Sequence, residues 1–249
     1  MSMSCKLNAF FRINCAGLAL SLIVLTVLQH AEAKSVYWGR SKKTVVLDPG
    51  HGGADAGARS PDGLLEKKVV LELSKQIVER VTGPYNVRLT RSEDYRLDTD
   101  RRTDLANNLG ADIFISVHAA GSFSSATKGI CIYYLKGAVA GNLNESGSIR
   151  NSQDPLPTWD NLQFRHVHTS RLLAKNLKDQ LSPLSQTTIM AAPLLVLRGA
   201  DMPAVLIEVG YLSNPDDAKT LRDSQYLKSL AVAINDGIDA FFSDLRRAK

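Results

Sequence analysis

The segment Val45–Gly53 constrains this chain more than any other, because an apolar run of β-type residues stops abruptly at Asp-Pro-Gly and a histidine follows among glycines. A strand that ends in this way places the next side chain at the edge of a sheet, and ligands bind at that edge in open α/β sheets. The glycines leave room around His51 and permit backbone angles that other residues resist. The segment therefore predicts a histidine at the edge of the sheet that acts as a ligand or catalyst. A glycine-rich turn with an incidental surface histidine is the alternative.

Strand-like and helix-like segments alternate along the rest of the chain. Apolar β-type runs predict strands over residues 44–48, 86–90, 112–117, 129–135, 194–197 and 204–209. Apolar residues at helical spacing predict helices over 62–81 (with Asp62 as N-cap), 98–109, 163–181 and 226–242. This alternation indicates an α/β fold, with one domain built on a mostly parallel sheet that helices flank on both faces.

The first 33 residues have the pattern of an export signal. Lys6 and Arg12 precede an apolar run over 15–28, and an Ala31-x-Ala33 cleavage pattern follows. The run is shorter than the roughly 20 residues of a membrane span. We expect a signal peptide over 1–33, a short extension over 34–43, a catalytic domain over 44–249 and no stable membrane span after processing. An uncleaved anchor is the alternative.

Charge and cysteine content restrict the class of partner. The chain carries 30 Lys and Arg against 25 Asp and Glu, and removing the leader with Lys6, Arg12 and Glu32 leaves a net charge of +4. This mild positive charge suits an anionic polymer or surface, and it is too dispersed to predict nucleic-acid binding. Only Cys131 remains after the leader, so an intramolecular disulfide is excluded and a buried, inert thiol is expected.

Two further residues provide partners for His51. His118 also follows an apolar strand and precedes small residues, and two histidines at one sheet edge can converge on a metal ion. Glu66 precedes Val70 and Leu73 by four and seven residues, which places its carboxylate on the buried stripe of a helix. A buried, unpaired carboxylate is costly, and a shared metal ion would satisfy it. A carboxylate held by the helix N-terminus is the alternative.

Two histidines and a glutamate with water in an open position form a known hydrolytic zinc arrangement. Such a zinc lowers the pKa of its water to about 7, and a second carboxylate must then move the water's proton to the leaving group. Glu208 closes an apolar strand at the expected edge and suits this role, with a structural ion pair to an arginine such as Arg198 as the alternative. His166 and His168, on different faces of a helix start, are expected at the surface or in a cap.

The ordered motifs of the chain resemble those of the zinc-dependent N-acetylmuramoyl-L-alanine amidases of the amidase-3 family. The resemblance rests on the blocks Leu47-Asp48-Pro49-Gly50-His51-Gly52-Gly53, Glu66, Thr90-Arg91, Arg102-x-x-x-Ala106-Asn107, Ala111–Ala119 and Pro203–Asn214. It implies zinc held by His51, Glu66 and His118, with Glu208 as general base and later acid. It also implies a sheet of about six strands, export to the periplasm or cell envelope, and cleavage of peptidoglycan between the lactyl group of N-acetylmuramic acid and L-alanine.

The sequence departs from the family pattern at one position and leaves one segment open. Ala120 replaces an amide side chain that usually follows the second histidine, which affects the groups that orient the ligands. Residues 137–161 are rich in Gly, Asn, Ser, Asp and Pro and predict a loop insertion. We expect a lid or substrate-contacting loop with Trp159 as a sugar-stacking residue, on which an activator protein could act, or else a solvated insertion.

Two other functions stay open at this point. A zinc carboxypeptidase-like enzyme could use the same two histidines and glutamate. A non-catalytic cell-wall-binding module could keep the fold without the activity, although all four site residues are present.

Overall fold

The computed structural model describes residues 42–135 and 159–248, and of residues 159–161 the backbone alone. The expected signal peptide, nearly all of the extension over 34–43 and most of the loop over 137–161 therefore lie outside the described residues. The residues from Lys43 onward cluster as one unit. None of the helices in the described ranges has the length and apolar character that crossing a bilayer requires.

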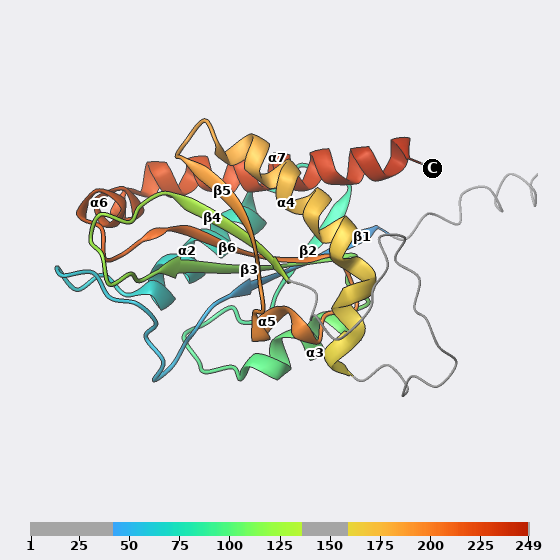
Figure 1. The fold of residues 1–249 in the computed structure, drawn as a ribbon, viewed down its shortest axis with the longest axis horizontal. Coiled ribbons are helices and arrows are strands. Elements are labelled where there is room, and N and C mark those ends of the chain that lie inside the picture. Colours follow the sequence, from blue (N-terminus) through green and yellow to red (C-terminus); the bar gives the residue numbers. More distant parts are fainter. Residues whose placement is uncertain (1–41, 136–158, 249) are drawn as a thin grey trace, which may run out of the picture. The chain divides into compact units, whose positions relative to one another are not determined.

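A six-stranded sheet forms the centre of the fold, in the order β2-β1-β3-β6-β4-β5 (Figure 1). Strands β2, β1, β3 and β6 are parallel, whereas β4 pairs antiparallel with β6 and parallel with β5. The bounds are β1 Lys43–Pro49, β2 Tyr85–Leu89, β3 Ile113–Ala120, β4 Ile130–Leu135, β5 Thr187–Ala192 and β6 Ala204–Tyr211. The predicted α/β class with a mostly parallel sheet is confirmed.

Helices cover both faces of the sheet, as expected for this class. Figure 1 shows α4 and α7 above the sheet and α3 and α5 below it. The helices are α2 Glu66–Glu79, α3 Thr99–Asn108, α4 Val167–Leu181, α5 Leu195–Arg198, α6 Pro215–Arg222 and α7 Ser224–Arg247, with a 3-10 helix η1 over Trp159–His166. Alternate strand residues enter two cores: Val45 and Leu47 pack with α2, α4 and α7, while Val46 packs on the α3 and α5 side.

One element prediction was wrong in type, and two elements were not predicted. The apolar run over 194–197 is not a strand but lies in the short helix α5, because a short apolar run does not distinguish a strand from a buried helical turn. The edge strand β5 was not predicted, because only Thr187 of its residues is buried and the segment lacks a strong apolar pattern. Helix α6 was not predicted, although Asn214 caps it by accepting from the backbone N–H groups of Asp216 and Asp217.

The predicted start of the helix over 62–81 was also wrong. Helix α2 begins at Glu66, and its N-cap is Leu65 rather than Asp62. Asp62 instead lies in the preceding turn, where its carboxylate pairs with Arg222 at 2.7 Å. Residues 159–161, expected in a loop, belong to η1, so the helix predicted over 163–181 starts as a 3-10 helix and becomes α4 at Val167.

Candidate metal centre

The backbone turns sharply where β1 ends, and this turn presents His51. The N–H of Gly50 donates to the carbonyl of Val117 at 2.9 Å, which ties the turn to β3. His51 has a φ of 59° and is the only non-glycine residue in the described ranges with a positive φ. This left-handed conformation costs roughly 1–2 kcal/mol for an L-residue. Gly50 must lack a side chain, because a Cβ there would overlap the His118 ring.

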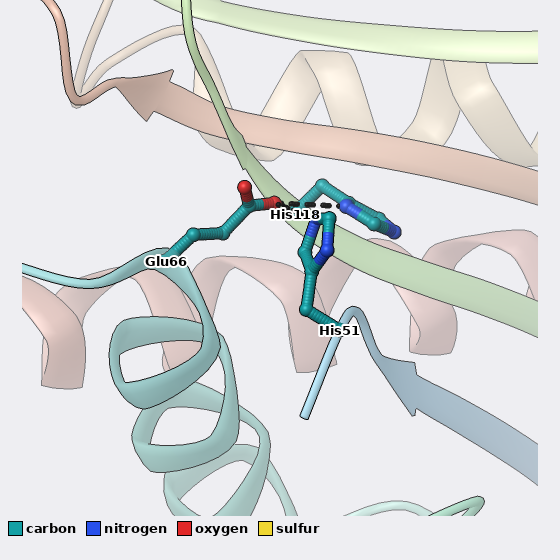
Figure 2. Close-up of side chains that lie close together, drawn as sticks. All are labelled: His51, Glu66 and His118. Carbon is teal, nitrogen blue, oxygen red and sulfur yellow. Dashed lines mark hydrogen bonds and ion pairs between the residues drawn. The ribbon is translucent and has the colours of Figure 1, made fainter. Parts of the chain in front are cut away.

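Glu66 is the first residue of α2, and its carboxylate points toward the turn rather than into solvent (Figure 2). The side chain is buried, as the helical spacing predicted. Its Oε1 accepts from the backbone N–H of Ala119 at 3.0 Å, and its Oε2 accepts from the N–H of Ala58 at 2.7 Å. These contacts fix the carboxylate against β3 and the loop that precedes α2.

Both predicted histidines meet this carboxylate. His118 Nδ1 lies 2.8 Å from Glu66 Oε1, and His51 Nε2 lies 3.1 Å from the same oxygen. The two rings are nearly perpendicular, with centroids 5.0 Å apart. Each residue offers one ligand atom, and these atoms lie within 4.8 Å of one another, which suits a shared metal ion (Figure 2). His118 lies within β3 rather than after it, which corrects its predicted position by a few residues.

The electrostatics of the three side chains fit a cation. Burial lowers the pKa of His51, but Glu66 and Asp55 outweigh it and raise that pKa to about 9. Burial likewise raises the pKa of Glu66, and the hydrogen bonds from His118 and His51 outweigh it, which lowers this pKa to about 2. The pocket therefore favours positive charge beside an ionised carboxylate. Two imidazole nitrogens and one carboxylate oxygen are a donor set typical of zinc.

Asp55 orients His51, a role that was not predicted from the sequence. Its Oδ2 lies 2.9 Å from His51 Nδ1, which leaves Nε2 directed toward Glu66. Its Oδ1 accepts from the backbone N–H of Gly57 at 3.1 Å. A carboxylate on the second nitrogen is the usual way to fix the tautomer and orientation of a metal-binding histidine. The four-residue separation of Asp55 from His51 in a glycine-rich loop was the available signal.

Glu208 lies at the same edge, as predicted. It is on β6 directly opposite His118 on β3, and within the described ranges its buried Oε2 has no hydrogen-bond partner. Burial raises the pKa of Glu208 to about 7, modified by the charges of His118, Glu66 and His51. A carboxylate with a pKa near 7 can both accept and release a proton.

A cleft of about 360 Å³ opens beside the histidines on the α3 and α5 face of the sheet. Leu195 and Val196 form an apolar wall, and Arg96 and Asp98 supply charged groups at the same opening. An extended substrate that enters this cleft would pass His51 and His118. The arrangement can therefore bring a polar bond to a metal ion held beside the two histidines.

Four further residues singled out by their sequence pattern are outside the proposed ligand set. His166 Nε2 contacts Asp201 at 3.1 Å, and His168 is exposed, so the predicted surface roles are confirmed. Cys131 is a free, buried cysteine, as expected. Trp159 lies in η1, and its side chain is outside what the structure describes.

Several known proteins are similar to this chain in sequence and in fold. The family model Amidase_3, described as N-acetylmuramoyl-L-alanine amidase, matches residues 45–240. The amidase AmiA of Salmonella typhimurium is 32% identical over 235 residues, which cover 86% of this chain and 80% of that protein. The amidase AmiC of Neisseria meningitidis serogroup B is 32% identical over 221 residues, and this chain spans about half of its length, 53%.

Solved structures lead to the same group. The catalytic domain of CwlV, an N-acetylmuramoyl-L-alanine amidase from Bacillus (Paenibacillus) polymyxa var. colistinus, aligns with a TM-score of 0.65 and 29% identity over 81% of this chain and 98% of that domain. The CwlD amidase from Clostridioides difficile, solved in complex with the GerS lipoprotein, aligns with a TM-score of 0.65 and 25% identity over 81% of this chain and 99% of that chain. Together with the family match over residues 45–240, these likenesses show that this chain belongs to the Amidase_3 family of N-acetylmuramoyl-L-alanine amidases.

Proposed function

We propose that the chain is a zinc-dependent peptidoglycan hydrolase that cleaves the amide between the lactyl group of N-acetylmuramic acid and L-alanine of the stem peptide. In this proposal His51, Glu66 and His118 hold the zinc ion, and Glu208 is the general base and acid. The observation that carries it is the convergence of three ligand atoms within 4.8 Å of one another, with Glu208 opposite His118.

Bound zinc would polarise the scissile carbonyl and lower the pKa of a water molecule. Glu208 then accepts a proton from the attacking water, since its own pKa near 7 makes the ionised form available at neutral pH. After the amide bond has been attacked, Glu208 returns this proton to the leaving amine of L-alanine. Asp55 keeps His51 in the orientation that directs Nε2 inward.

The family and the sequence support a proposed substrate and location. Peptidoglycan is an anionic polymer that suits the mild positive charge of the chain. We place the protein in the periplasm or cell envelope, delivered there by the predicted signal peptide over 1–33. An activator protein that acts on residues 137–161 is part of the proposal, and the solved complex of CwlD with a lipoprotein is a precedent in a relative.

One experiment separates this function from its rivals. Purified protein with zinc is incubated with intact peptidoglycan, and the soluble products are analysed by mass spectrometry. Free stem peptides with a new L-alanine amino terminus are the expected product. Single D-amino acids would instead identify a carboxypeptidase-like enzyme. Binding to the wall without hydrolysis would identify a non-catalytic module. The Glu208→Gln variant is the control for contaminating hydrolases.

A further inference from the structure

Three consecutive backbone carbonyls in the β1 turn all accept hydrogen bonds from arginine side chains. Arg102 donates from Nη1 to the carbonyl of Pro49 at 2.9 Å and from Nη2 to the carbonyl of His51 at 3.0 Å. Arg91 donates from Nε to the carbonyl of Pro49 at 2.9 Å and from Nη2 to the carbonyl of Gly50 at 2.6 Å. Two guanidinium groups thus hold the backbone that carries His51.

Both arginines are buried, which is unusual for this residue type. Arg91 has no exposed surface and Arg102 is 5% exposed. One buried carboxylate, Asp48, compensates part of their charge through Oδ1, which lies 2.7 Å from Arg102 Nη1. All the hydrogen-bond acceptors found for Arg91 are backbone carbonyls, the other two being those of Glu93 and Lys67. A buried charge needs such partners, so the turn and the arginines depend on each other.

The turn has a left-handed backbone conformation that is unfavourable for a histidine without contacts that hold it. His51, Gly52 and Gly53 have φ values of 59°, 124° and 59°, and only the first of these residues carries a side chain. The direction of each carbonyl is coupled to these angles. A change of φ at His51 would rotate the Gly50–His51 peptide, whose carbonyl Arg91 holds, relative to the imidazole that reaches Glu66.

We propose that Arg102 and Arg91 are positioning residues for the metal ligand His51. They hold the carbonyls of Pro49, Gly50 and His51, and thereby keep the left-handed backbone from which the imidazole reaches Glu66. The inference rests on the proposed function, because it assumes that His51 binds zinc.

A substrate-binding role for Arg102 is the competing explanation, since this residue lines the cleft. Its hydrogen bonds argue against that role. Nη1 donates to Asp48 and to Pro49, and Nη2 donates to His51 and to the carbonyl of Leu97 at 2.8 Å. Each terminal nitrogen carries two N–H groups, so none of these four is left for a substrate anion.

The test is the zinc affinity of Arg102→Lys, measured by competition with a chromophoric chelator. Lysine keeps the positive charge but replaces the fork of donors by a single ammonium group, which cannot hold the same set of acceptors. We expect the dissociation constant for zinc to rise roughly 10- to 100-fold, as is typical when groups that orient a ligand are lost. The absorption spectrum of the cobalt-substituted protein should change too, because the ligand geometry is altered. Arg101→Lys is the matched control, since Arg101 is the adjacent, exposed arginine of α3.

Thermal unfolding of the metal-free variants separates positioning from loss of the fold. Arg91→Lys serves as a second variant, with the same expected loss of zinc affinity. If both lysine variants bind zinc with the wild-type affinity and give the wild-type cobalt spectrum, the inference is wrong while the proposed function stands. A raised KM with unchanged zinc affinity would instead assign Arg102 to the substrate. If the wild-type protein binds no zinc, the proposed function fails and takes this inference with it.

Discussion

His118 on β3 and Glu208 on β6 lie directly opposite each other in a parallel register. Residues paired in this way project from the same face of a sheet, so both side chains point to the α3 and α5 side, where the cleft lies. The pairing becomes irregular immediately afterwards, between His118 and Ala120, where β6 contributes an additional residue. The relative position of the proposed metal ligand and the proposed base is therefore fixed by backbone hydrogen bonds of two central strands.

Replacing Glu208 should separate catalysis from metal binding. Glu208→Gln keeps the shape of the side chain but cannot take a proton from water, and we expect kcat to fall by about 10²- to 10⁴-fold. Zinc affinity should stay within a few-fold of wild type, because Glu208 is outside the group of three ligands. Release of stem peptides and chelator competition measure the two quantities. Glu79→Gln, at an exposed position of α2, is the matched control. Unchanged hydrolysis by Glu208→Gln would contradict the mechanism.

Replacing Glu66, in contrast to replacing Glu208, should mainly weaken zinc binding. Glu66→Gln retains one carbonyl oxygen for the N–H groups of Ala58 or Ala119, but it removes the negative charge between His51 and His118. We expect zinc affinity to fall by at least about 100-fold, more than is typical for an orienting residue. The measurement is the rise in melting temperature on adding zinc, which depends on the ratio of zinc concentration to its dissociation constant. A rise as large as that of the wild type would exclude Glu66 as a ligand.

The clustering of the four candidate residues at one sheet edge could be predicted from the sequence, because each of them has a strong local signature. His51 follows the apolar strand β1, His118 lies near the end of β3, Glu66 lies on the buried stripe of α2, and Glu208 is near the end of β6. In parallel strands these ends meet at one edge of the sheet, so local patterns were enough to bring the residues together. The class of fold followed from the same alternation of strands and helices.

What the sequence did not predict depends on contacts between distant segments. The carbonyl contacts of Arg91 and Arg102 join residues about 40 to 50 positions apart, and no periodicity marks them. The role of Asp55 depends on the left-handed conformation of His51, which a histidine adopts rarely. The antiparallel direction of β4 could not be read from its apolar run, since pairing direction depends on the connection that follows and on the neighbouring strand.

The pKa shifts predict how the stability of the metal-free protein depends on pH. The raised pKa of His51, about 9, stabilises the fold fully below pH 6.5, and this contribution is lost as the pH rises toward 9. The raised pKa of Glu208, about 7, acts in the same direction, because its contribution is lost as the pH rises from 4.5 through 7. The lowered pKa of Glu66, about 2, contributes above pH 4.5 and is lost as the pH falls toward 2.

We therefore expect the melting temperature of the metal-free protein to fall as the pH rises from 4.5 to 9, first through Glu208 and then through His51, and also to fall as the pH drops below 4.5, through Glu66. One pKa unit corresponds to about 1.4 kcal/mol, so the loss at high pH is on the order of a few kcal/mol. Calorimetry in the presence of a chelator measures it. With excess zinc the trend at high pH should weaken or reverse, because deprotonated ligands bind the metal more tightly. A metal-free protein that is equally stable at pH 6.5 and pH 9 would contradict the assignment of these shifts.

A pair of glycine substitutions tests whether the space around the ligands matters apart from backbone strain. Gly57 and Gly110 have similar left-handed φ values, 66° and 59°. A Cβ at Gly57 would overlap Glu66 Oε2 and the His51 ring, whereas a Cβ at Gly110 would have no described atom within 4 Å.

Alanine at either position should cost roughly 1–2 kcal/mol of stability for the conformation alone. Only Gly57→Ala should also weaken zinc binding, by about tenfold or more, because it displaces groups that must hold their geometry. Chelator competition on the two variants, with thermal unfolding as a measure of the shared strain, makes the comparison. Equal zinc affinities in Gly57→Ala and Gly110→Ala would show that the loop before α2 can yield without moving His51 or Glu66, and the close packing seen there would then not be needed for the metal centre.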